Sequence, residues 1–506
     1  MEDIKNDRAK LREFFINLPY TYDVDASVTD IKENYAKFEN KEVSLAGRII
    51  AIRKSGKLIF IDILAESGKI QTYFDFNILG NEKFDIIKAL NAGDIIGVKG
   101  TVFKTTPGEI SIKVKEFQQL SKALQSLPDK WHGLQNTEIR YRKRYLDLII
   151  NSNVREIFKK RSLIIKKIRH YLDQRGFIEF ETPVIQPLYG GADAEPFKTF
   201  VNTLNEEDYL RISNELYLKR LIIGGFEKVY EIYKAFRNED IDVTHSPEFT
   251  MIELYQAYVD YNEMMKLNEG LFSFLAKEVL GSTEFEYQGK KISFSTPFKR
   301  LGFLDGINAK VGFDISKLSD EELFKLAESK GIQFEKGKRT RAHAYNKLLE
   351  VLVQPELIQP TFIIDFPKET TALARPKRGN NSLVERFELY IDGIEISNAY
   401  SELNNPIIQK ENFEEEEKKA MEGDKEAEPL DNEFIEAMEY GMPPTGGIGI
   451  GIDRLVMLLT NQSSIKEVIL FPMEKREIKS TKAINNENIN SKSDNSKINN
   501  KGKKQQ

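Results

Sequence analysis

The chain of 506 residues contains no cysteine, one tryptophan and only four histidines. The absence of cysteine excludes disulfides, thiolate nucleophiles and sulfur-ligated metal sites. So few histidines, at positions 132, 170, 245 and 343, do not favour a multi-histidine metal centre.

The sequence also lacks a long apolar run and an excess of positive charge. No stretch has the length of a membrane span, and the N-terminus, MEDIKNDRAKLREFF, is charged from the start, without an apolar signal core. The net charge is −5, with 40% hydrophobic and 30% charged residues. We therefore expect a cytoplasmic globular enzyme of two or three domains, with nucleic acid bound, if at all, by a local surface.

Changes of pattern divide the chain into five segments. Residues 1–40 form a charged, helical extension. About five short alternating strands within 41–122 predict a five-stranded barrel of the oligonucleotide-binding (OB) type. A linker over 123–150 leads to 151–476, where helices and strands of antiparallel pattern alternate irregularly. This predicts an α+β domain with an antiparallel sheet flanked by helices. The polar tail, 477–506, is expected to be disordered.

The segment PPTGGIGIGIDRLVMLL carries the most informative pattern, because Gly447, Gly449 and Gly451 alternate with isoleucines. Side chains on a strand alternate between its faces, so one face would be apolar and the other bare. A bare face beside Arg454 suits a flat ligand such as a nucleotide. The glycines lie inside the strand, unlike those of a dinucleotide-binding turn. The alternative is a tightly packed strand crossing.

Two alternating strands flank the polar loop RNEDIDVTHSPE and predict an antiparallel pair. Phe249, Glu253 and Tyr255 share one face of the second strand, and this set suits a ligand with an aromatic base and a cation. Arg237, at the end of the first strand, could hold a phosphate or carboxylate with two parallel hydrogen bonds. The alternative is an exposed, salt-bridged strand pair.

The segment VERFELYIDGIEISNAYSELNN predicts a hairpin with a two-residue Asp-Gly turn. Glu388 and Glu395 would then be diagonal neighbours on one face, where two carboxylates repel unless a cation lies between them. Oxygen ligands of this kind favour Mg²⁺. Asn398 would face away from Glu395 unless a bulge near Ser397 interrupts the ladder. The alternative is an ordinary acidic hairpin.

Two further segments carry weaker signals. In LYGGADAEPF, Gly190 and Gly191 permit close approach of the backbone, although paired glycines are usually turns. In YLRISNELYLKR, Glu215 is a carboxylate within reach of a cationic group, or else the partner of Lys219 four residues later.

Together these segments resemble the three signature motifs of the class II aminoacyl-tRNA synthetases. The helix at 161–177 with the following FIEFETPVIQP resembles motif 1, FRNE at 236–239 with HSPEFTMIELY resembles motif 2, and GGIGIGIDR at 446–454 resembles motif 3. The segments RYRKRYLDLI, LYLKRLIIGGFEKVYEI, EISNAYSELN and EYGMPPTGG narrow the resemblance to the lysyl-tRNA synthetase family, in the subclass that holds the aspartyl and asparaginyl enzymes. The resemblance extends from about residue 40 to 475.

This resemblance implies a lysine–tRNA ligase. Such an enzyme activates L-lysine with ATP to lysyl-adenylate, releases pyrophosphate and transfers lysine to the 3′-terminal adenosine of tRNA(Lys). The resemblance also implies Mg²⁺ as the cofactor and a homodimer joined at motif 1. Activation needs positioning and charge stabilisation rather than a protein acid or base, consistent with the scarcity of histidine and cysteine. The alternative is a synthetase-like paralogue that binds RNA or lysylates a protein without charging tRNA.

The resemblance further assigns residues to each ligand. Arg237 and Arg454 would be catalytic. The ATP-binding residues would be Arg237, Glu239, His245, Phe249 and Arg454, and the metal ligands Glu388 and Glu395. Lysine would be bound by Gly191, Glu215, Glu253, Tyr255, Asn398 and Glu402. The glutamates of this set suit a doubly cationic amino acid, whereas an aspartyl enzyme needs a basic residue there. The anticodon would be bound by Arg48, Phe60, Gln71 and Glu109, with a barrel core position as the alternative for Phe60.

Overall fold

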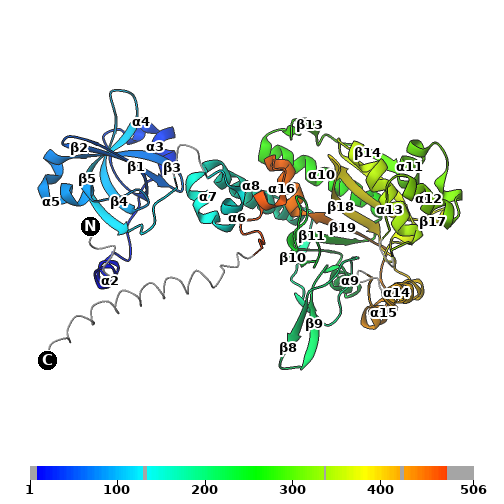
Figure 1. Ribbon diagram of the computed structural model, residues 1–506. Coiled ribbons are helices and arrows are strands. Elements are labelled where there is room, and N and C mark those ends of the chain that lie inside the picture. Colours follow the sequence, from blue (N-terminus) through cyan, green and yellow to red (C-terminus); the bar gives the residue numbers. More distant parts are fainter. Residues whose placement is uncertain (1–7, 129–133, 335–337, 422–426, 476–506) are drawn as a thin grey trace, which may run out of the picture. The chain divides into compact units, whose positions relative to one another are not determined.

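The computed structural model describes residues 8–128, 134–334, 338–421 and 427–475. Its contacts divide the chain into two compact units, Met1–Gln135 and Asn136–Gln506. Figure 1 shows the elements of both. The expected disordered tail, 477–506, lies outside the described residues.

The N-terminal unit is built on a closed barrel of five strands, with the order β1-β2-β3-β5-β4. The strands are β1 (Glu42–Ser55), β2 (Leu58–Ala65), β3 (Gly68–Asp75), β4 (Ile95–Lys104) and β5 (Ile110–Ser121). β1 pairs antiparallel with both β2 and β4, which closes the barrel, and β3 pairs parallel with β5. Alternating apolar residues fill the interior, because successive strand side chains point to opposite faces. The predicted OB-type barrel is confirmed.

Short helices surround this barrel. They are α2 (Arg8–Ile16), α3 (Val28–Glu33), α4 (Tyr35–Phe38) and α5 (Phe76–Lys88), the last lying between β3 and β4. The Ser27 side chain caps α3 by accepting a hydrogen bond from the backbone N–H of Asp30. Val28 and Ile31 of this helix belong to the barrel core. The segment before the first strand thus packs onto the barrel.

The C-terminal unit contains a large mixed sheet with the order β14-β15-β17-β18-β19-β11-β10-β6. The strands are β6 (Ile178–Glu179), β10 (Lys228–Phe236), β11 (Glu248–Ala257), β14 (Lys299–Gly302), β15 (Thr361–Pro367), β17 (Asn380–Ile391), β18 (Ile394–Ser401) and β19 (Thr445–Gly451), with β16 (Pro376–Lys377) beside β17. The consecutive pairs from β15 to β10 are antiparallel, whereas β14 and β6 add parallel pairs at the two ends. The α+β class and the antiparallel core of the sheet are as predicted.

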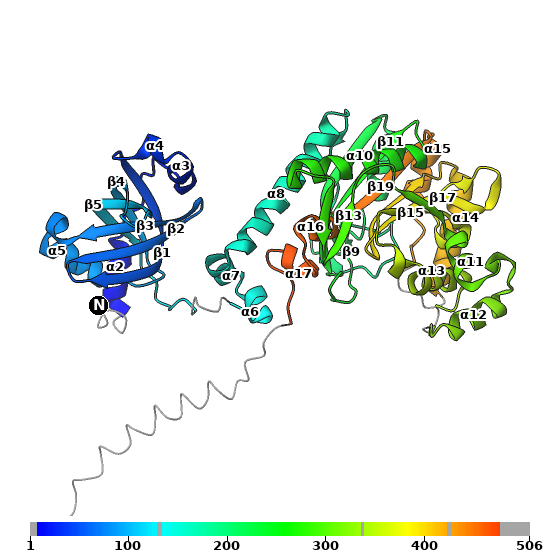
Figure 2. The same ribbon diagram turned by 90° about the horizontal axis from the view of Figure 1, so that it is seen from above.

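Helices α10 (Tyr261–Leu280) and α16 (Ile452–Thr460) pack on one face of this sheet, and α8 (Ser152–Asp173) packs against both of them. Figure 2, in which the molecule is seen from above, shows α8 as a long helix of this unit. Apolar side chains of the three helices and of the sheet form the main core of the unit. Ile448 and Ile450 of β19 point into this core, so the glycines between them lie on the opposite face.

The remaining elements lie around this sheet. Smaller sheets are formed by β7 (Ile185–Gln186), β8 (Lys198–Val201) and β9 (Glu206–Leu210), and by β12 (Glu284–Tyr287) and β13 (Lys290–Ser293). The other helices are α6 (Thr137–Arg142), α7 (Arg144–Ile150), α9 (Glu215–Ile223), α11 (Phe303–Val311), α12 (Asp320–Ser329), α13 (Arg341–Leu352), α14 (Pro406–Met421), α15 (Asn432–Glu439) and α17 (Ile465–Val468). Helices α11, α12 and α13 form a second core against β15. In the described ranges, no helix has the length and apolarity to cross a membrane.

Candidate active site

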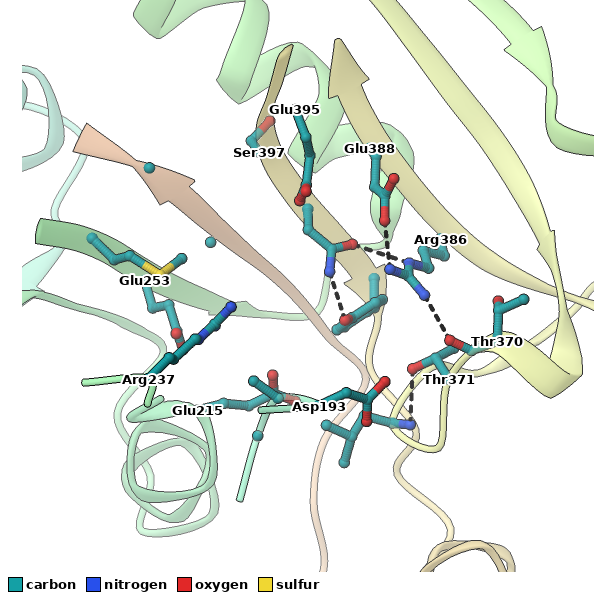
Figure 3. A pocket seen from close by; sticks show the side chains of 18 of the residues that line it. Asp193, Glu215, Arg237, Glu253, Thr370, Thr371, Arg386, Glu388, Glu395 and Ser397 are labelled. Carbon is teal, nitrogen blue, oxygen red and sulfur yellow. Dashed lines mark hydrogen bonds and ion pairs between the residues drawn. The ribbon is translucent and has the colours of Figure 1, made fainter. Parts of the chain in front are cut away.

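A cavity of about 420 Å³ lies on the sheet face that the glycines of β19 occupy. Figure 3 shows part of its lining. The cavity brings together residues that are more than 200 positions apart in the sequence. All the side chains predicted for ATP, lysine and metal line it: Gly191, Glu215, Arg237, Glu239, His245, Phe249, Glu253, Tyr255, Glu388, Glu395, Asn398, Glu402 and Arg454.

The three glycines of β19 serve this cavity in two ways. A Cβ on Gly447 would lie 2.1 Å from Oε1 of Glu402 and 2.4 Å from the ring of Tyr255. A Cβ on Gly449 or Gly451 would meet nothing closer than 3.4 Å and 3.7 Å, respectively. The bare face expected from the sequence is therefore open at Gly449 and Gly451, whereas Gly447 makes room for two neighbouring side chains.

Two guanidinium groups and an aromatic ring line the cavity. The guanidinium carbon of Arg237, directly after β10, is 5.3 Å from the ring centre of Phe249. Arg454, in the first turn of α16, donates a hydrogen bond to the carbonyl oxygen of Glu395 at 2.8 Å. Its Nη2 lies 3.0 Å from Nε2 of His245. Fixed guanidiniums beside an aromatic face suit a phosphate attached to an aromatic base.

Glu253, near the middle of β11, is a buried carboxylate that also lines the cavity. Ser213 Oγ donates to it at 3.0 Å and the Tyr255 hydroxyl at 3.1 Å, and the Tyr233 hydroxyl donates a further, short hydrogen bond. Burial, reinforced by the negative charge of Glu215, raises the pKa of Glu253 to about 7. A cationic ligand would favour the charged form of this carboxylate.

Lys219 of α9 lies fully buried between two more carboxylates. Its Nζ is 2.5 Å from Oε2 of Glu402, and it also forms an ion pair with Glu215. The Glu215–Lys219 pair that the sequence left open is therefore formed. Burial raises the pKa of Glu402 to about 8, although Lys219 opposes this shift. Together with Glu253, these residues give the cavity three buried carboxylates, and one ammonium pairs with two of them. This surplus of negative charge suits a cationic ligand.

β17 and β18 form the predicted hairpin, and its turn residues at 392 and 393 have left-handed φ angles of 51° and 71°. Tyr390 lies opposite Glu395 and Glu388 opposite Asn398, so Ile396 is an extra residue in β18. This is the bulge that the sequence analysis required near position 397. It brings Glu395 and Asn398 into the same cavity, which a regular ladder would not do.

The carboxylates of this hairpin form an oxygen donor set. Glu388 is held by Arg386, with Nη2 2.5 Å from Oε1, and by the Tyr390 hydroxyl at 2.6 Å from Oε2. Burial raises the pKa of Glu388, an effect that Arg386 opposes and the charge of Glu395 strengthens. A cation between Glu388 and Glu395 would relieve this repulsion, and such a pair fits Mg²⁺. No group of three or more candidate ligands exists among the described residues, so substrate or water would complete the coordination.

Arg386 and the tyrosine at position 400 orient the side chain of Asn398. Arg386 Nε donates to Oδ1 of Asn398 at 3.1 Å, and Nδ2 of Asn398 donates to the Tyr400 hydroxyl at 2.8 Å. The sequence analysis did not single out Arg386. Its place two residues before Glu388, on the same strand face, was the available signal. Lys219 was named only as a possible salt-bridge partner, because its complete burial depends on the packing of α9 against β11.

A separate groove lies on the barrel of the N-terminal unit. Its lining includes three of the predicted anticodon residues, Phe60, Gln71 and Glu109, together with Tyr73, Phe103, Lys113 and Lys115. Phe60 lies outside the buried core cluster of the barrel and packs edge-on against Tyr73, with ring centres 5.4 Å apart. Arg48 does not line the groove, and its Nη1 donates to the carbonyl oxygen of Gly93 at 2.8 Å. Aromatic faces beside lysines suit a single-stranded base.

The features above are those of an enzyme that binds a nucleotide and a cationic amino acid and carries an OB-type module. Residues 136–475 match the model of the family described as tRNA synthetases class II (D, K and N). Residues 43–120 match that of the OB-fold nucleic acid binding domain. The chain belongs to the class II tRNA synthetase family, in its D, K and N group, and it is an aminoacyl-tRNA synthetase. The resemblance drawn from the three motifs is thereby confirmed.

Within that family, the relatives that the chain matches carry the name lysine–tRNA ligase. The protein of Clostridium botulinum (strain Hall) is 50% identical over 449 residues, which cover 88% of this chain and 89% of that protein. The protein of Methanoculleus marisnigri is 49% identical over 472 residues, with 92% and 93% covered. The protein of Thermoanaerobacter pseudethanolicus is 50% identical over 448 residues, with 88% and 90% covered.

Proposed function

We infer that this chain is a lysine–tRNA ligase, which activates L-lysine with ATP and transfers it to tRNA(Lys). One observation carries this inference. In a chain half identical to curated lysine–tRNA ligases, a surplus of buried carboxylates lines the cavity. The alternative paralogue, which binds RNA or lysylates a protein, is not favoured by these relatives or by a chain that combines the barrel with the full motif set.

The amino acid would lie beside the buried carboxylates of the cavity. Glu253, Tyr255 and Glu402 would surround the side-chain ammonium, and Gly191 with Glu215 would receive the α-ammonium. The short distance between Gly191 and Glu215 supports the assignment of both to the α-ammonium, because a Cβ on Gly191 would lie 2.9 Å from Cβ of Glu215. The α-carboxylate would meet the amide of Asn398, whose Nδ2 is a hydrogen-bond donor.

ATP would lie beside the two guanidinium groups of the cavity. Phe249 would stack on the adenine, with Arg454 on its other side, and Glu239 and His245 would position the nucleotide. Arg237 would bind both the α-phosphate and the lysine carboxylate. Arg237 would thereby hold the two reacting groups in the orientation for attack, which lowers the entropic part of the activation barrier.

The metal ligands would be Glu388 and Glu395. When bound there, Mg²⁺ would neutralise negative charge on the phosphates. Arg386 would hold Glu388 in place through the 2.5 Å contact with its Oε1.

The reaction would be an in-line attack by the lysine carboxylate on the α-phosphorus of ATP, which releases pyrophosphate. Arg237 and Arg454 would stabilise the negative charge that develops on the phosphoryl oxygens. No protein group needs to accept a proton in this step, because the attacking carboxylate is already ionised. The 3′-hydroxyl of the terminal adenosine of tRNA(Lys) would then attack the acyl carbon of the adenylate, which forms the ester and releases AMP and the hydroxyl proton.

The anticodon would be bound by the barrel. Phe60 would stack on the central base, and Gln71 would read its edge, with Glu109 beside them in the same groove. Arg48 would act from outside that groove. The anticodon-binding domain would span 41–122 and the catalytic domain 151–476, joined by 123–150.

We further propose a cytoplasmic homodimer joined at motif 1. Several apolar side chains that follow α8 are exposed in the single chain, among them Ile178, Val184, Ile185 and Phe226. Clustered exposed apolar residues of this kind mark protein interfaces. Analytical ultracentrifugation tests this proposal, and a monomer at micromolar concentration would contradict it.

The experiment for the activity is amino-acid-dependent ATP–pyrophosphate exchange with each of the twenty amino acids, followed by aminoacylation of tRNA(Lys). We expect exchange with lysine alone and charging of tRNA(Lys). Exchange with another amino acid would contradict the assignment of the carboxylate pocket. Activation without charging would support the paralogue instead.

A further inference from the structure

One carboxylate that lines the active-site cavity has no role in the assignment above. Glu428 lies between α14 and α15, and its side chain is 3% exposed. The backbone N–H of Gly191 donates a hydrogen bond to it. Its Oε2 is buried and has no hydrogen-bond partner. A buried carboxylate oxygen without a partner costs free energy, which a ligand that supplies a donor would recover.

The charges that act on Glu428 are of its own sign. Burial raises the pKa of Glu428 well above its usual range, and the charges of Asp193, Glu215 and Glu416 add to this shift. The neighbouring cations are already paired, Lys419 with Glu416 at 2.6 Å and Lys219 with Glu215. Among the residues that the structure describes, no unpaired cation therefore neutralises Glu428, and a cationic ligand would supply that charge.

Glu428 also lies at a defined place relative to the proposed lysine seat. A Cβ on Gly190 would be 3.8 Å from Oε2 of Glu428, and a Cβ on Gly191 would be 2.9 Å from Cβ of Glu215. The two carboxylates thus flank the same glycine loop. In the proposed function, this loop and Glu215 receive the α-ammonium group.

We propose that Glu428 is a further specificity-determining residue, which binds the α-ammonium group of lysine through Oε2 while the hydrogen bond from Gly191 holds its other end. This inference rests on the proposed function. An ammonium group has three donors. The carbonyl oxygen of Gly191 and the carboxylates of Glu215 and Glu428 would supply three acceptors, so no donor of the ligand is left unpaired.

The test is Glu428→Gln, an isosteric change that keeps an oxygen for the Gly191 N–H and replaces the free acceptor by a donor. Two quantities are measured in the exchange reaction of the full-length protein: KM for lysine, and the inhibition constant of 6-aminohexanoate, which lacks the α-ammonium group. We expect KM to rise about tenfold or more, the equivalent of about 1.4 kcal/mol. The inhibition constant should change by less than about twofold, because that probe never contacts Glu428.

The matched control is Glu436→Gln, because Glu436 is an exposed carboxylate of α15 that does not line the cavity. This variant should leave KM for lysine unchanged. An equal rise for lysine and 6-aminohexanoate in Glu428→Gln would overturn the inference, since Glu428 would then only shape the loop. Unchanged values for both ligands would overturn it as well. A wild-type protein without lysine-dependent exchange would instead refute the proposed function, and this inference with it.

Discussion

Nζ of Lys219 lies 2.5 Å from Oε2 of Glu402, in an ion pair whose two side chains are both fully buried. The same ammonium also pairs with Glu215, one helical turn earlier. An internal cation thus pairs with two carboxylates that line the cavity we assign to a cationic amino acid. It allows several carboxylates to be buried together, which would otherwise repel one another.

Replacing this cation should destabilise the fold. We expect Lys219→Met to lower the free energy of unfolding by about 3–5 kcal/mol, because it leaves buried carboxylates without their partner. The measurement is urea denaturation followed by circular dichroism. The control is Lys234→Met, which removes an exposed ion pair of 3.4 Å with Glu248 and should cost less than about 1 kcal/mol. Similar losses in both variants would contradict this account.

Gly447 should tolerate no side chain. In Gly447→Ala the new Cβ would lie 2.1 Å from Oε1 of Glu402, so the carboxylate must move. We expect KM for lysine in pyrophosphate exchange to rise about tenfold or more, the effect of losing about 1.4 kcal/mol of binding. Gly451→Ala serves for comparison, because its Cβ would have no neighbour closer than 3.7 Å, and it should affect KM for lysine much less. An equal effect at both positions would show that the backbone, and not the contact with Glu402, is responsible.

The affinity for lysine should increase with pH around neutrality. The pKa of Glu253 is raised to about 7 and that of Glu402 to about 8. A cationic ligand binds the ionised carboxylates, so binding below these values must release protons, and the affinity rises with pH until both groups are ionised. Isothermal titration in two buffers of different ionisation enthalpy at pH 6.5 measures the release. In Glu253→Gln fewer protons should be released, and an unchanged number would rule Glu253 out as a source.

The hairpin carboxylates should determine the magnesium requirement. We expect Glu395→Gln to raise the Mg²⁺ concentration for half-maximal exchange by about tenfold, the effect of about 1.4 kcal/mol. Glu286→Gln, at an exposed position of the β12–β13 hairpin, should leave it unchanged. A magnesium titration at fixed ATP measures both, and identical curves for wild type and Glu395→Gln would argue against the metal assignment.

Binding of tRNA should depend on Phe60, without any effect on activation. Stacking on a single base is worth about 1–3 kcal/mol, so Phe60→Ala should raise KM for tRNA about fivefold to more than a hundredfold. The rate of ATP–pyrophosphate exchange without tRNA should stay at the wild-type level, because the barrel forms a unit of its own. A parallel loss of both activities would mean that the substitution unfolds the protein.

Local pattern was enough to place much of the candidate site. Strand alternation showed that Phe249, Glu253 and Tyr255 share a face. The Asp-Gly turn located Glu388 and Glu395, and even the bulge at Ile396 followed from the need to bring Asn398 to the same side. These features depend on the two-residue period of a strand, which can be recognised in the amino-acid sequence. Arg48 lies outside the groove that Phe60 lines, and this could not be predicted from the sequence. Its position depends on where one strand of the closed barrel lies relative to another.

The sequence by itself determined the class of fold, the motifs and the family, since these depend on residue type and spacing along the chain. Only the tertiary structure decided which charges are paired. Whether Lys219 is a surface partner of Glu215 or a buried cation shared with Glu402 depends on how α9 packs against the sheet. Whether Glu428 is a solvated acid or an unpaired acceptor beside Gly191 depends on a contact between segments more than 200 residues apart. Burial determines the free energy of a charge, and burial is a property of the folded chain.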